Sequence, residues 1–303
     1  MHLLLLKLRK FRTNKAKLKT LEASSAKSFS FNSKGELFEV DKPWVMGILN
    51  VTPDSFYDGG TKKSDLEFLN HTERMVMEGA KIIDVGGYSS RPDATDISIT
   101  DELKRVIPII IKISERFPGI LISIDTFRSK VAKEAISAGA NMVNDISAGK
   151  LDGKMLETIS ELKVPYIMMH MRGTPQTMKS QNVYDDLLKE IIYYFSERIA
   201  EARSLQIMDI IIDPGFGFAK NIEQNFELLR KLDLLHILDL PILVGLSRKS
   251  MIYKTLETSP NEALNGTTAL NMLALGKGVS FLRVHDVKEA VECIKLNELY
   301  SKT

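Results

Sequence analysis

Short apolar runs alternate along this chain with longer amphipathic segments. Eight of the runs have the length and aliphatic composition of buried strands, and five of the segments between them repeat apolar residues at helical spacing. This alternation is typical of a parallel sheet covered by helices, and eight such units favour a closed (β/α)8 TIM barrel over an open sheet. No Gly-x-Gly-x-x-Gly motif follows the first run, which argues against a dinucleotide-binding fold. The expected strands are Val45–Leu49, Lys81–Val85, Leu121–Ile124, Met142–Asn144, Tyr166–Met169, Ile210–Ile212, Ile242–Val244 and Phe281–Val284, and the expected helices are Asp65–Glu78, Asp101–Arg116, Ser129–Ala138, Tyr184–Ser204 and Val287–Tyr300.

The region before the first expected strand has two parts. Residues 28–40 alternate apolar and polar side chains around Asn32-Ser33-Lys34-Gly35, which predicts a short β-hairpin that caps the floor of the barrel. Residues 1–24 are basic and poor in acids, and we expect a loosely attached extension there. A basic amphipathic helix or an organelle-type presequence is the alternative. Residues 25–303 are then a single barrel domain.

The formal net charge of +2 hides an uneven distribution. Seven basic residues precede the first acidic one, Glu22, and without these seven the 41 basic residues fall to 34 against 39 acidic ones. The body of the chain is therefore acidic and offers no footprint for nucleic acid. Its one cysteine, Cys293, excludes a disulfide framework and fits a reducing compartment. No apolar run reaches the roughly 18 residues of a membrane span, so we expect a cytoplasmic protein without a membrane partner.

Polar side chains follow every expected strand. In a parallel barrel the carboxyl ends of all strands meet at one rim, where enzymes of this fold hold their active sites. The same residues would be scattered between both ends if they were only structural. They are Asn50, Ser89-Ser90-Arg91, Asp125, Asn144-Asp145, His170, Asp213, Ser247-Arg248-Lys249, and Arg283 with His285.

Three of these positions place an acid or an amide at the end of an apolar run. Asp125, Asp213 and Asn144 should enter a partly desolvated pocket, where a carboxylate needs paired hydrogen-bond donors. The 2-amino-4-oxo edge of a pterin offers adjacent N–H donors of this kind. The alternative is that such acids cap the helices that follow, and for Asp145 the two interpretations are equally supported.

Cations gather on the same expected rim. Arg91, Lys249, Arg283 and His285 together suit a diphosphate or another doubly charged anion. A purely structural role stays open for His285, and Arg248 is expected to point away and brace its loop. His170 and Met168 on the fifth strand are more typical of barrel filling than of ligand binding.

Taken together, these motifs resemble those of the dihydropteroate synthase family. The resemblance covers roughly residues 29–298 in order. It is carried by Met46-Gly47-Ile48-Leu49-Asn50-Val51-Thr52-Pro53-Asp54-Ser55-Phe56, Asp58-Gly59-Gly60, Asp84-Val85-Gly86-Gly87, Ser90-Arg91-Pro92, Ile124-Asp125-Thr126, Asn144-Asp145-Ile146, Asp213-Pro214-Gly215-Phe216-Gly217-Phe218 with Lys220, Gly245-Leu246-Ser247-Arg248-Lys249-Ser250, and Arg283-Val284-His285-Asp286-Val287.

The resemblance implies a reaction and a role for individual residues. The implied activity joins a dihydropterin methyl diphosphate to 4-aminobenzoate with the help of Mg²⁺, in an enzyme that is a homodimer and a sulfonamide target. The pterin would be held by Asp125, Asn144, Asp213 and Lys249, with Met168 and Arg283 packing on it. Asn50 would bind the metal. Ser90, Arg91, Arg283 and His285 would contact the diphosphate, and Pro92, Phe218, Lys249 and Ser250 would surround the aminobenzoate. Catalysis would rest on Arg91, Lys249, Arg283 and His285.

Four positions depart from the pattern of the family. Tyr88 stands where many members have Glu, Ser90 where many have Thr, and Asp93 and Ala219 where many have Gly. Asp93 adds a negative charge beside Arg91, which puts the resting position of the second loop in doubt. Two rival functions remain: a pterin-binding methyltransferase domain, which has no need of the cationic rim, and a pterin-binding protein without activity.

Overall fold

The computed structural model describes residues 28–52, 65–89 and 96–302. Its main sheet has eight parallel strands in the order β8-β7-β6-β5-β4-β3-β10-β9. A parallel bridge between Ile212 and Ile242 joins the two end strands, so the sheet closes into the expected barrel. The strands are β3 (Trp44–Asn50), β4 (Ile82–Gly86), β5 (Leu121–Asp125), β6 (Met142–Asp145), β7 (Tyr166–Met169), β8 (Ile210–Asp213), β9 (Leu243–Val244) and β10 (Phe281–Val284).

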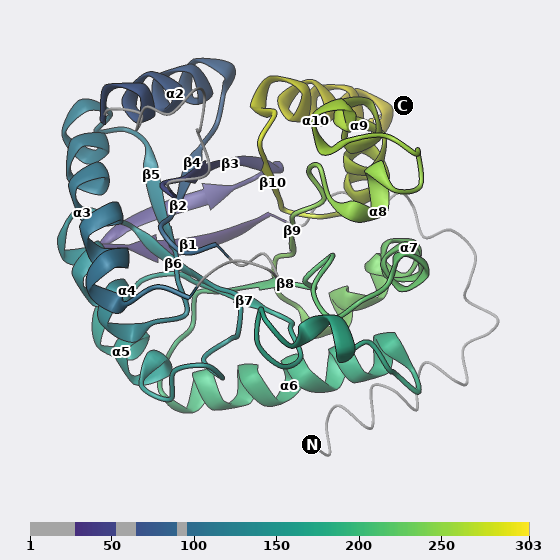
Figure 1. Ribbon diagram of the computed structural model, residues 1–303, viewed down its shortest axis with the longest axis horizontal. Helices are drawn as coiled ribbons and strands as arrows, with labels where there is room; N and C mark the ends of the chain where they lie inside the picture. The colour runs from purple at the N-terminus through teal and green to yellow at the C-terminus, as the bar shows by residue number, and fades with distance from the viewer. Residues whose placement is uncertain (1–27, 53–64, 90–95, 303) are drawn as a thin grey trace.

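Helices form an outer ring around these strands (Figure 1). Two of the expected helices have the bounds that the sequence predicts, while the helix before β8 begins three residues later than expected. It begins there because the Asp186 side chain accepts a hydrogen bond from the Lys189 amide and so caps the first turn. The helices are α2 (Asp65–Glu78), α3 (Ile99–Arg116), α4 (Ser129–Ser137), α5 (Met155–Leu162), α6 (Leu187–Ser204), α7 (Ile222–Arg230), α8 (Ser250–Tyr253), α9 (Leu264–Leu275) and α10 (Val287–Tyr300), with 3-10 turns η1 (Met178–Ser180), η2 (Leu232–Leu238) and η3 (Pro260–Glu262). None of the described helices is long and apolar enough to cross a membrane.

Side chains alternate between two apolar layers along each strand. One layer fills the space between the strands and the helices. The other fills the lower part of the barrel and consists mainly of Met46, Ile82, Leu121, Met142, Ile167, Ile211, Leu243 and Phe281. Because strand side chains alternate with a period of two, the residue two positions further along each strand also points inward, one layer closer to the carboxyl rim. This register carries Asp84, Asn144, Asp213 and Arg283 into the mouth of the barrel.

A β-hairpin closes the opposite end of the barrel, as the sequence predicts. Strands β1 (Phe29–Ser33) and β2 (Glu36–Val40) are antiparallel, and Lys34 and Gly35 take positive φ in the turn between them. Phe31 meets Trp44 edge to face with the ring centroids 5.9 Å apart, and Phe29 meets Phe281 at 5.5 Å. The hairpin therefore packs on the floor of the barrel, at the end opposite the carboxyl rim.

Candidate active site

Four neighbouring strands present one row of residues at the carboxyl rim. Asn50 pairs with Gly86, Gly86 with Asp125, and Asp125 with Asn144, so these residues lie side by side across β3 to β6. Gly86 has no side chain, and the position that its Cβ would take lies 3.6 Å from Asn50 Oδ1 and 3.7 Å from Asp125 Oδ2. The row thus places an amide oxygen and a carboxylate on either side of a position that carries no side chain.

Arg283 of β10 forms salt bridges with two aspartates at the mouth of the barrel. Its Nε donates to Asp84 Oδ2 at 2.6 Å and its Nη2 donates to Asp125 Oδ2 at 2.7 Å. Burial alone would lower the pKa of Arg283, but the two carboxylates outweigh it and hold that pKa above its ordinary value. Burial raises the pKa of Asp125 to about 7, although the Arg283 cation acts in the opposite direction. The guanidinium is therefore a fixed cation, whereas Asp125 can change its charge near neutral pH.

Asp84 is a site residue that the reasoning from strand ends missed. It lies in the middle of β4, its side chain is 0% exposed, and its Oδ2 also accepts from Asn144 Nδ2 at 3.0 Å. Since a carboxylate accepts hydrogen bonds, this contact fixes which end of the Asn144 amide faces inward. An acid inside the apolar run Ile82–Val85 was the signal available in the sequence.

Lys249 and Asp213 form the neighbouring part of the rim. Lys249 Nζ donates to the Phe216 carbonyl and lies 4.8 Å from the centre of the Phe218 ring. Burial lowers the pKa of Lys249 to about 8, and the Asp213 carboxylate opposes that shift. Asp213 is buried, and its Oδ1 accepts from the Gly215 amide at 2.8 Å. Burial raises the pKa of Asp213, with the Lys249 cation acting against it.

Two neighbouring residues confirm that the loops after β9 and β10 are held together. Arg248 donates from Nε and Nη2 to the two carboxylate oxygens of Asp286 at 2.9 and 2.7 Å, so it braces the loop as predicted. His285 Nδ1 lies 2.9 Å from Ser247 Oγ, and its ring stands on the exposed rim. Ser250 follows Lys249 as the first residue of α8.

The side chain of Met168 points the wrong way for the predicted pterin contact. It is fully buried in the layer between the strands and the helices, together with Tyr166 and Phe195. Its neighbour Met169 belongs instead to the apolar cluster at the rim, against which Phe218 packs. The prediction for Met168 is therefore wrong by one position, because alternation turns adjacent strand residues to opposite faces.

Asp145 is a structural residue. Its carboxylate accepts from the Ser147 amide and hydroxyl at 2.7 Å each, from the Gly149 amide at 2.7 Å and from the Tyr166 hydroxyl at 2.6 Å. With these four donors, the carboxylate stabilises the turn after β6. Of the two interpretations offered by the sequence, the local capping role is the one that fits.

The structure describes two of the residues that depart from the family pattern, Tyr88 and Ala219. Tyr88 meets Phe127 edge to face at 5.1 Å, Arg128 lies 5.1 Å from its ring centre, and Gln176 Nε2 donates to its hydroxyl at 3.0 Å. It thereby links the loops after β4, β5 and β7. Ala219 adopts a φ of 50°, a left-handed conformation that glycine would adopt with less strain.

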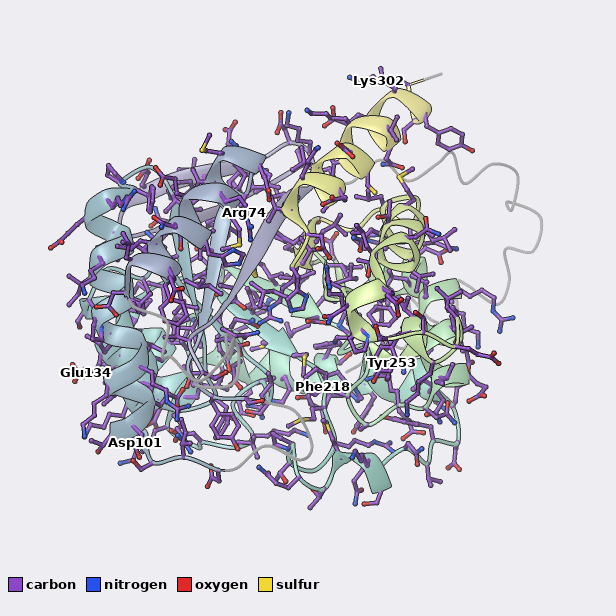
Figure 2. All side chains as sticks on the ribbon, turned by 45° about the horizontal axis from the view of Figure 1, so that its top comes forward. Arg74, Asp101, Glu134, Phe218, Tyr253 and Lys302 are labelled. Carbon is purple, nitrogen blue, oxygen red and sulfur yellow. The ribbon has the colours of Figure 1, made fainter. Side chains whose placement is uncertain are left out.

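The structure thus brings together most of the predicted site. Asn50, Asp125, Asn144, Asp213, Lys249 and Arg283 meet at one rim, with Phe218, Ser250 and His285 beside them. In the view of Figure 2, Phe218 lies toward the middle of the molecule, whereas Glu134 and Asp101 lie at its edge. The predictions for Ser90, Arg91, Pro92 and Asp93 fall outside the described residues, as does the extension of residues 1–24. The described part of the chain has no group of three His, Cys, Asp or Glu side chains that could hold a metal ion.

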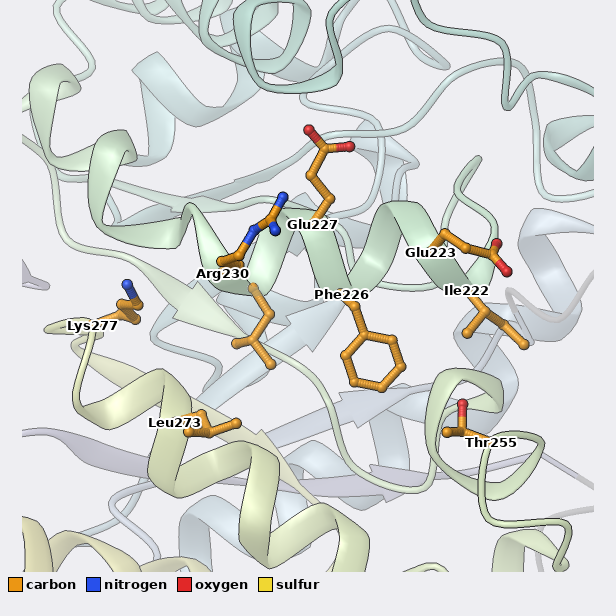
Figure 3. Close-up of a pocket in the computed structure, with 9 residues that line it drawn as sticks. Ile222, Glu223, Phe226, Glu227, Arg230, Thr255, Leu273 and Lys277 are labelled. Carbon is orange, nitrogen blue, oxygen red and sulfur yellow. The ribbon is translucent and has the colours of Figure 1, made fainter.

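A separate pocket lies on the outer side of the barrel. It is lined by residues of α7 and α9, among them Phe226, Arg230 and Leu273 (Figure 3). None of the predicted site residues lines it. The polar rim rather than this pocket is therefore the candidate active site.

Comparison with known proteins agrees with this geometry. Residues 46–285 match the family described as pterin binding enzyme. Dihydropteroate synthase of Escherichia coli K12 is 44% identical over 268 residues, which are 88% of this chain and 94% of that protein. The Yersinia pestis dihydropteroate synthase in complex with a sulfonamide drug superposes with a TM-score of 0.85 at 39% identity, covering 90% of this chain and 99% of that one. The Xanthomonas albilineans dihydropteroate synthase with 4-aminobenzoic acid also gives 0.85, at 38% identity, covering 91% of this chain and all of that one.

Fold and rim together define a pterin-binding enzyme built on a (β/α)8 barrel. The acids and the amide lie together at the strand ends of this rim. The chain belongs to the dihydropteroate synthase family.

Proposed function

We propose that this chain is a transferase that condenses (7,8-dihydropterin-6-yl)methyl diphosphate with 4-aminobenzoate, forming 7,8-dihydropteroate and diphosphate for folate biosynthesis. The observation that carries the proposal is the Arg283 cation held between Asp84 and Asp125, next to the amide of Asn144. This arrangement joins ring-binding acceptors to a fixed cation within one mouth. A site for a pterin alone would need the acceptors but not the cation.

The pterin ring is assigned to the inner part of the mouth. Asp125 and Asp213 offer carboxylate oxygens to its N–H donors, and Asn144 offers an amide to the neighbouring ring nitrogens. Arg283 and Met169 supply flat and apolar surface on which the ring can pack. The charge of Lys249 interacts with that of Asp213, and its ammonium is assigned to the 4-oxo group.

The diphosphate is assigned to the outer rim, close to Asn50. Arg283 and His285 line that rim, and Ser90 and Arg91 are proposed to contact the diphosphate as well. Mg²⁺ commonly takes only one or two protein oxygens and completes its shell with phosphate and water, so a single amide oxygen at Asn50 fits it. Mg²⁺ bound there would stabilise the negative charge of the departing diphosphate.

The reaction follows as a dissociative substitution. The bond between the pterin methylene carbon and the diphosphate oxygen breaks, and the arylamine nitrogen then forms the new carbon–nitrogen bond. The rim cations stabilise the leaving diphosphate, while the carboxylates stabilise the positive charge that is left on the pterin. The arylamine is neutral near pH 7, so the site needs no strong base before attack, and the ammonium proton leaves to diphosphate or water. Exclusion of water from the mouth protects the cation from hydrolysis.

The 4-aminobenzoate is assigned to the surface formed by Phe218, Lys249 and Ser250, with Pro92 as a further wall. Lys249 stands 4.8 Å from the Phe218 ring and so places a cation beside an aromatic face. A sulfonamide of the same shape and charge would occupy the same place. The relatives from Xanthomonas albilineans and Yersinia pestis were crystallised with 4-aminobenzoic acid and with a sulfonamide drug, which supports the binding of such ligands by this chain.

We also propose that the enzyme is a cytoplasmic homodimer that needs no nucleic acid or membrane partner. The free and buried thiol of Cys293 supports a reducing compartment. Light scattering on the purified chain tests the dimer, and a mass of one chain at micromolar concentration would contradict it.

Diphosphate release tests the function. Release from the pterin substrate should require 4-aminobenzoate and should stop in excess EDTA. Release without the arylamine would indicate a hydrolase. Tight pterin binding with no release at all would favour a binding protein without activity, and methyl transfer would favour the methyltransferase alternative.

A further inference from the structure

We infer that Lys220 is a positioning residue for the arylamine site, because it holds the loop after β8 in the shape that presents Phe218. The inference rests on the proposed function, since it takes Phe218 as a wall of that site. Lys220 itself is buried, and its ammonium donates to backbone carbonyls of the loop.

The Lys220 ammonium has one acceptor for each of its three N–H bonds. Nζ lies 3.0 Å from His170 Nδ1, and it donates to the Gly215 carbonyl at 2.9 Å and to the Phe218 carbonyl at 3.0 Å. One side chain thus ties the end of β7 to two points of the loop. Removing it would leave His170 Nδ1 and the Phe218 carbonyl without this donor, whereas the Gly215 carbonyl would keep its hydrogen bond from the Phe218 amide.

The loop has an unusual backbone, in which one residue with a side chain is strained. Gly215, Gly217 and Ala219 all have positive φ, at 70°, 80° and 50°. A Cβ at Gly215 would lie 2.1 Å from the His170 carbonyl oxygen, so the loop is pressed against the end of β7. Left-handed backbone is unfavourable for a residue with a side chain, so Ala219 keeps its conformation only while its surroundings fix it.

Two lysines hold different carbonyls of this one loop. Lys249 takes the Phe216 carbonyl, and Lys220 takes those of Gly215 and Phe218. Only Lys249 is also close to the Phe218 ring. The two side chains therefore have different roles. Lys249 is assigned to the substrates, and Lys220 sets the position of the loop.

Burial dominates the electrostatics of both Lys220 and His170. Burial lowers the pKa of Lys220 well below its ordinary value, and the Asp213 carboxylate opposes that shift. Burial and the Lys220 cation together lower the pKa of His170, which keeps the ring neutral and its Nδ1 able to accept. His170 also packs edge to face on Tyr194 at 4.8 Å, so it is a rigid anchor.

The test is Lys220→Met, with Lys133→Met on the surface of α4 as the matched control. Calorimetry would measure the dissociation constants of the pterin and, in the presence of pterin, Mg²⁺ and diphosphate, of a sulfonamide. We expect the sulfonamide to bind at least about tenfold more weakly to Lys220→Met, the scale of one lost hydrogen bond. The pterin constant should stay within about twofold, and KM for 4-aminobenzoate should rise while kcat is largely retained. Equal losses for both ligands, or no loss for either, would overturn the inference.

A double-mutant cycle separates the proposed route from a general loss of packing. If Lys220 acts through Phe218, then Lys220→Met should add little to the effect of Phe218→Ala on sulfonamide affinity. Additive effects would contradict that route. If wild type forms no dihydropteroate, the proposed function fails; if wild type is active and Lys220→Met binds sulfonamide as wild type does, only this inference fails.

A second pair of variants covers the case in which Lys220→Met does not fold. His170→Asn keeps an acceptor close to the Nδ1 position, whereas His170→Leu removes it. We expect His170→Asn to bind sulfonamide nearly as wild type does and His170→Leu to bind it several-fold more weakly, with pterin affinity equal in both. Equal sulfonamide affinity in the two variants would contradict the inference.

Discussion

Arg283 and Asp125 form a salt bridge of 2.7 Å across the mouth of the barrel, although β10 and β5 are separated in the sheet by two other strands. Their side chains are 20% and 17% exposed, so the pair is partly desolvated. A group that we assign to the diphosphate and a group that we assign to the pterin are thus in direct contact. Changes to either residue should therefore affect both functions to some extent.

Replacement of Asp125 by Asn should weaken pterin binding. The variant keeps the shape of the side chain but turns an N–H donor toward donors of the pterin. Loss of a charge-assisted pair together with this mismatch should cost about 2–4 kcal/mol, measured by calorimetry. Glu161→Gln, on the surface of α5, is the control and should leave the affinity unchanged. Unchanged affinity in Asp125→Asn would remove Asp125 from the pocket.

Loss of the metal should affect turnover far more than stability. Asn50 is the one amide that we assign to Mg²⁺. We expect the metal to stabilise the leaving diphosphate and to contribute little to the stability of the fold. Asn50→Ala, or excess EDTA with wild type, should lower kcat strongly while the thermal midpoint moves little. Full activity in excess EDTA would rule out the proposed role of Mg²⁺.

The rim cations should matter much more than a surface cation. Arg283→Ala and Lys249→Ala should each lower kcat/KM by at least about 10²-fold, the scale for losing one preorganised partner of a developing anion. Lys112→Ala is the control, since Lys112 makes an exposed ion pair with Asp65 on the outer helices. A control variant as damaged as the rim variants would show that the loss does not come from the site.

The rate should fall at alkaline pH as Lys249 loses its proton. Burial lowers the pKa of Lys249 to about 8, so the side chain is a cation below that pH and neutral above it. kcat/KM should therefore decline as the pH rises through about 8. In Lys249→Arg the guanidinium stays charged, so the plateau should be lower but the decline near pH 8 should disappear. An identical decline in both proteins would assign it to another group.

Fold and site differ in how far the sequence predicted them. Helices α2 and α10 have the predicted bounds, and α2 ends where Gly79 takes a φ of 107°. Gly139 likewise has a positive φ just after the end of α4, and Gly278 has one shortly after α9. Local backbone preferences were enough for these features.

Features that depend on distant contacts could not be predicted. Asp84 is bound to Arg283, 199 positions away, and a lone acid in an apolar run does not reveal its partner. Strand β7 is apolar throughout, so the sequence carried no alternation from which to tell Met168 from Met169. The link between Lys220 and His170 depends on the path of the loop after β8, which no local pattern encodes.

The most direct test of the central claim is product formation by the purified chain. The enzyme would be mixed with the dihydropterin methyl diphosphate, 4-aminobenzoate and Mg²⁺, and both products would be quantified by mass spectrometry and diphosphate assay. We expect dihydropteroate and diphosphate in equal amounts, over many turnovers per chain, with no product when Mg²⁺ is removed. Hydroxymethyl pterin in place of dihydropteroate, or bound pterin with no product, would contradict the claim.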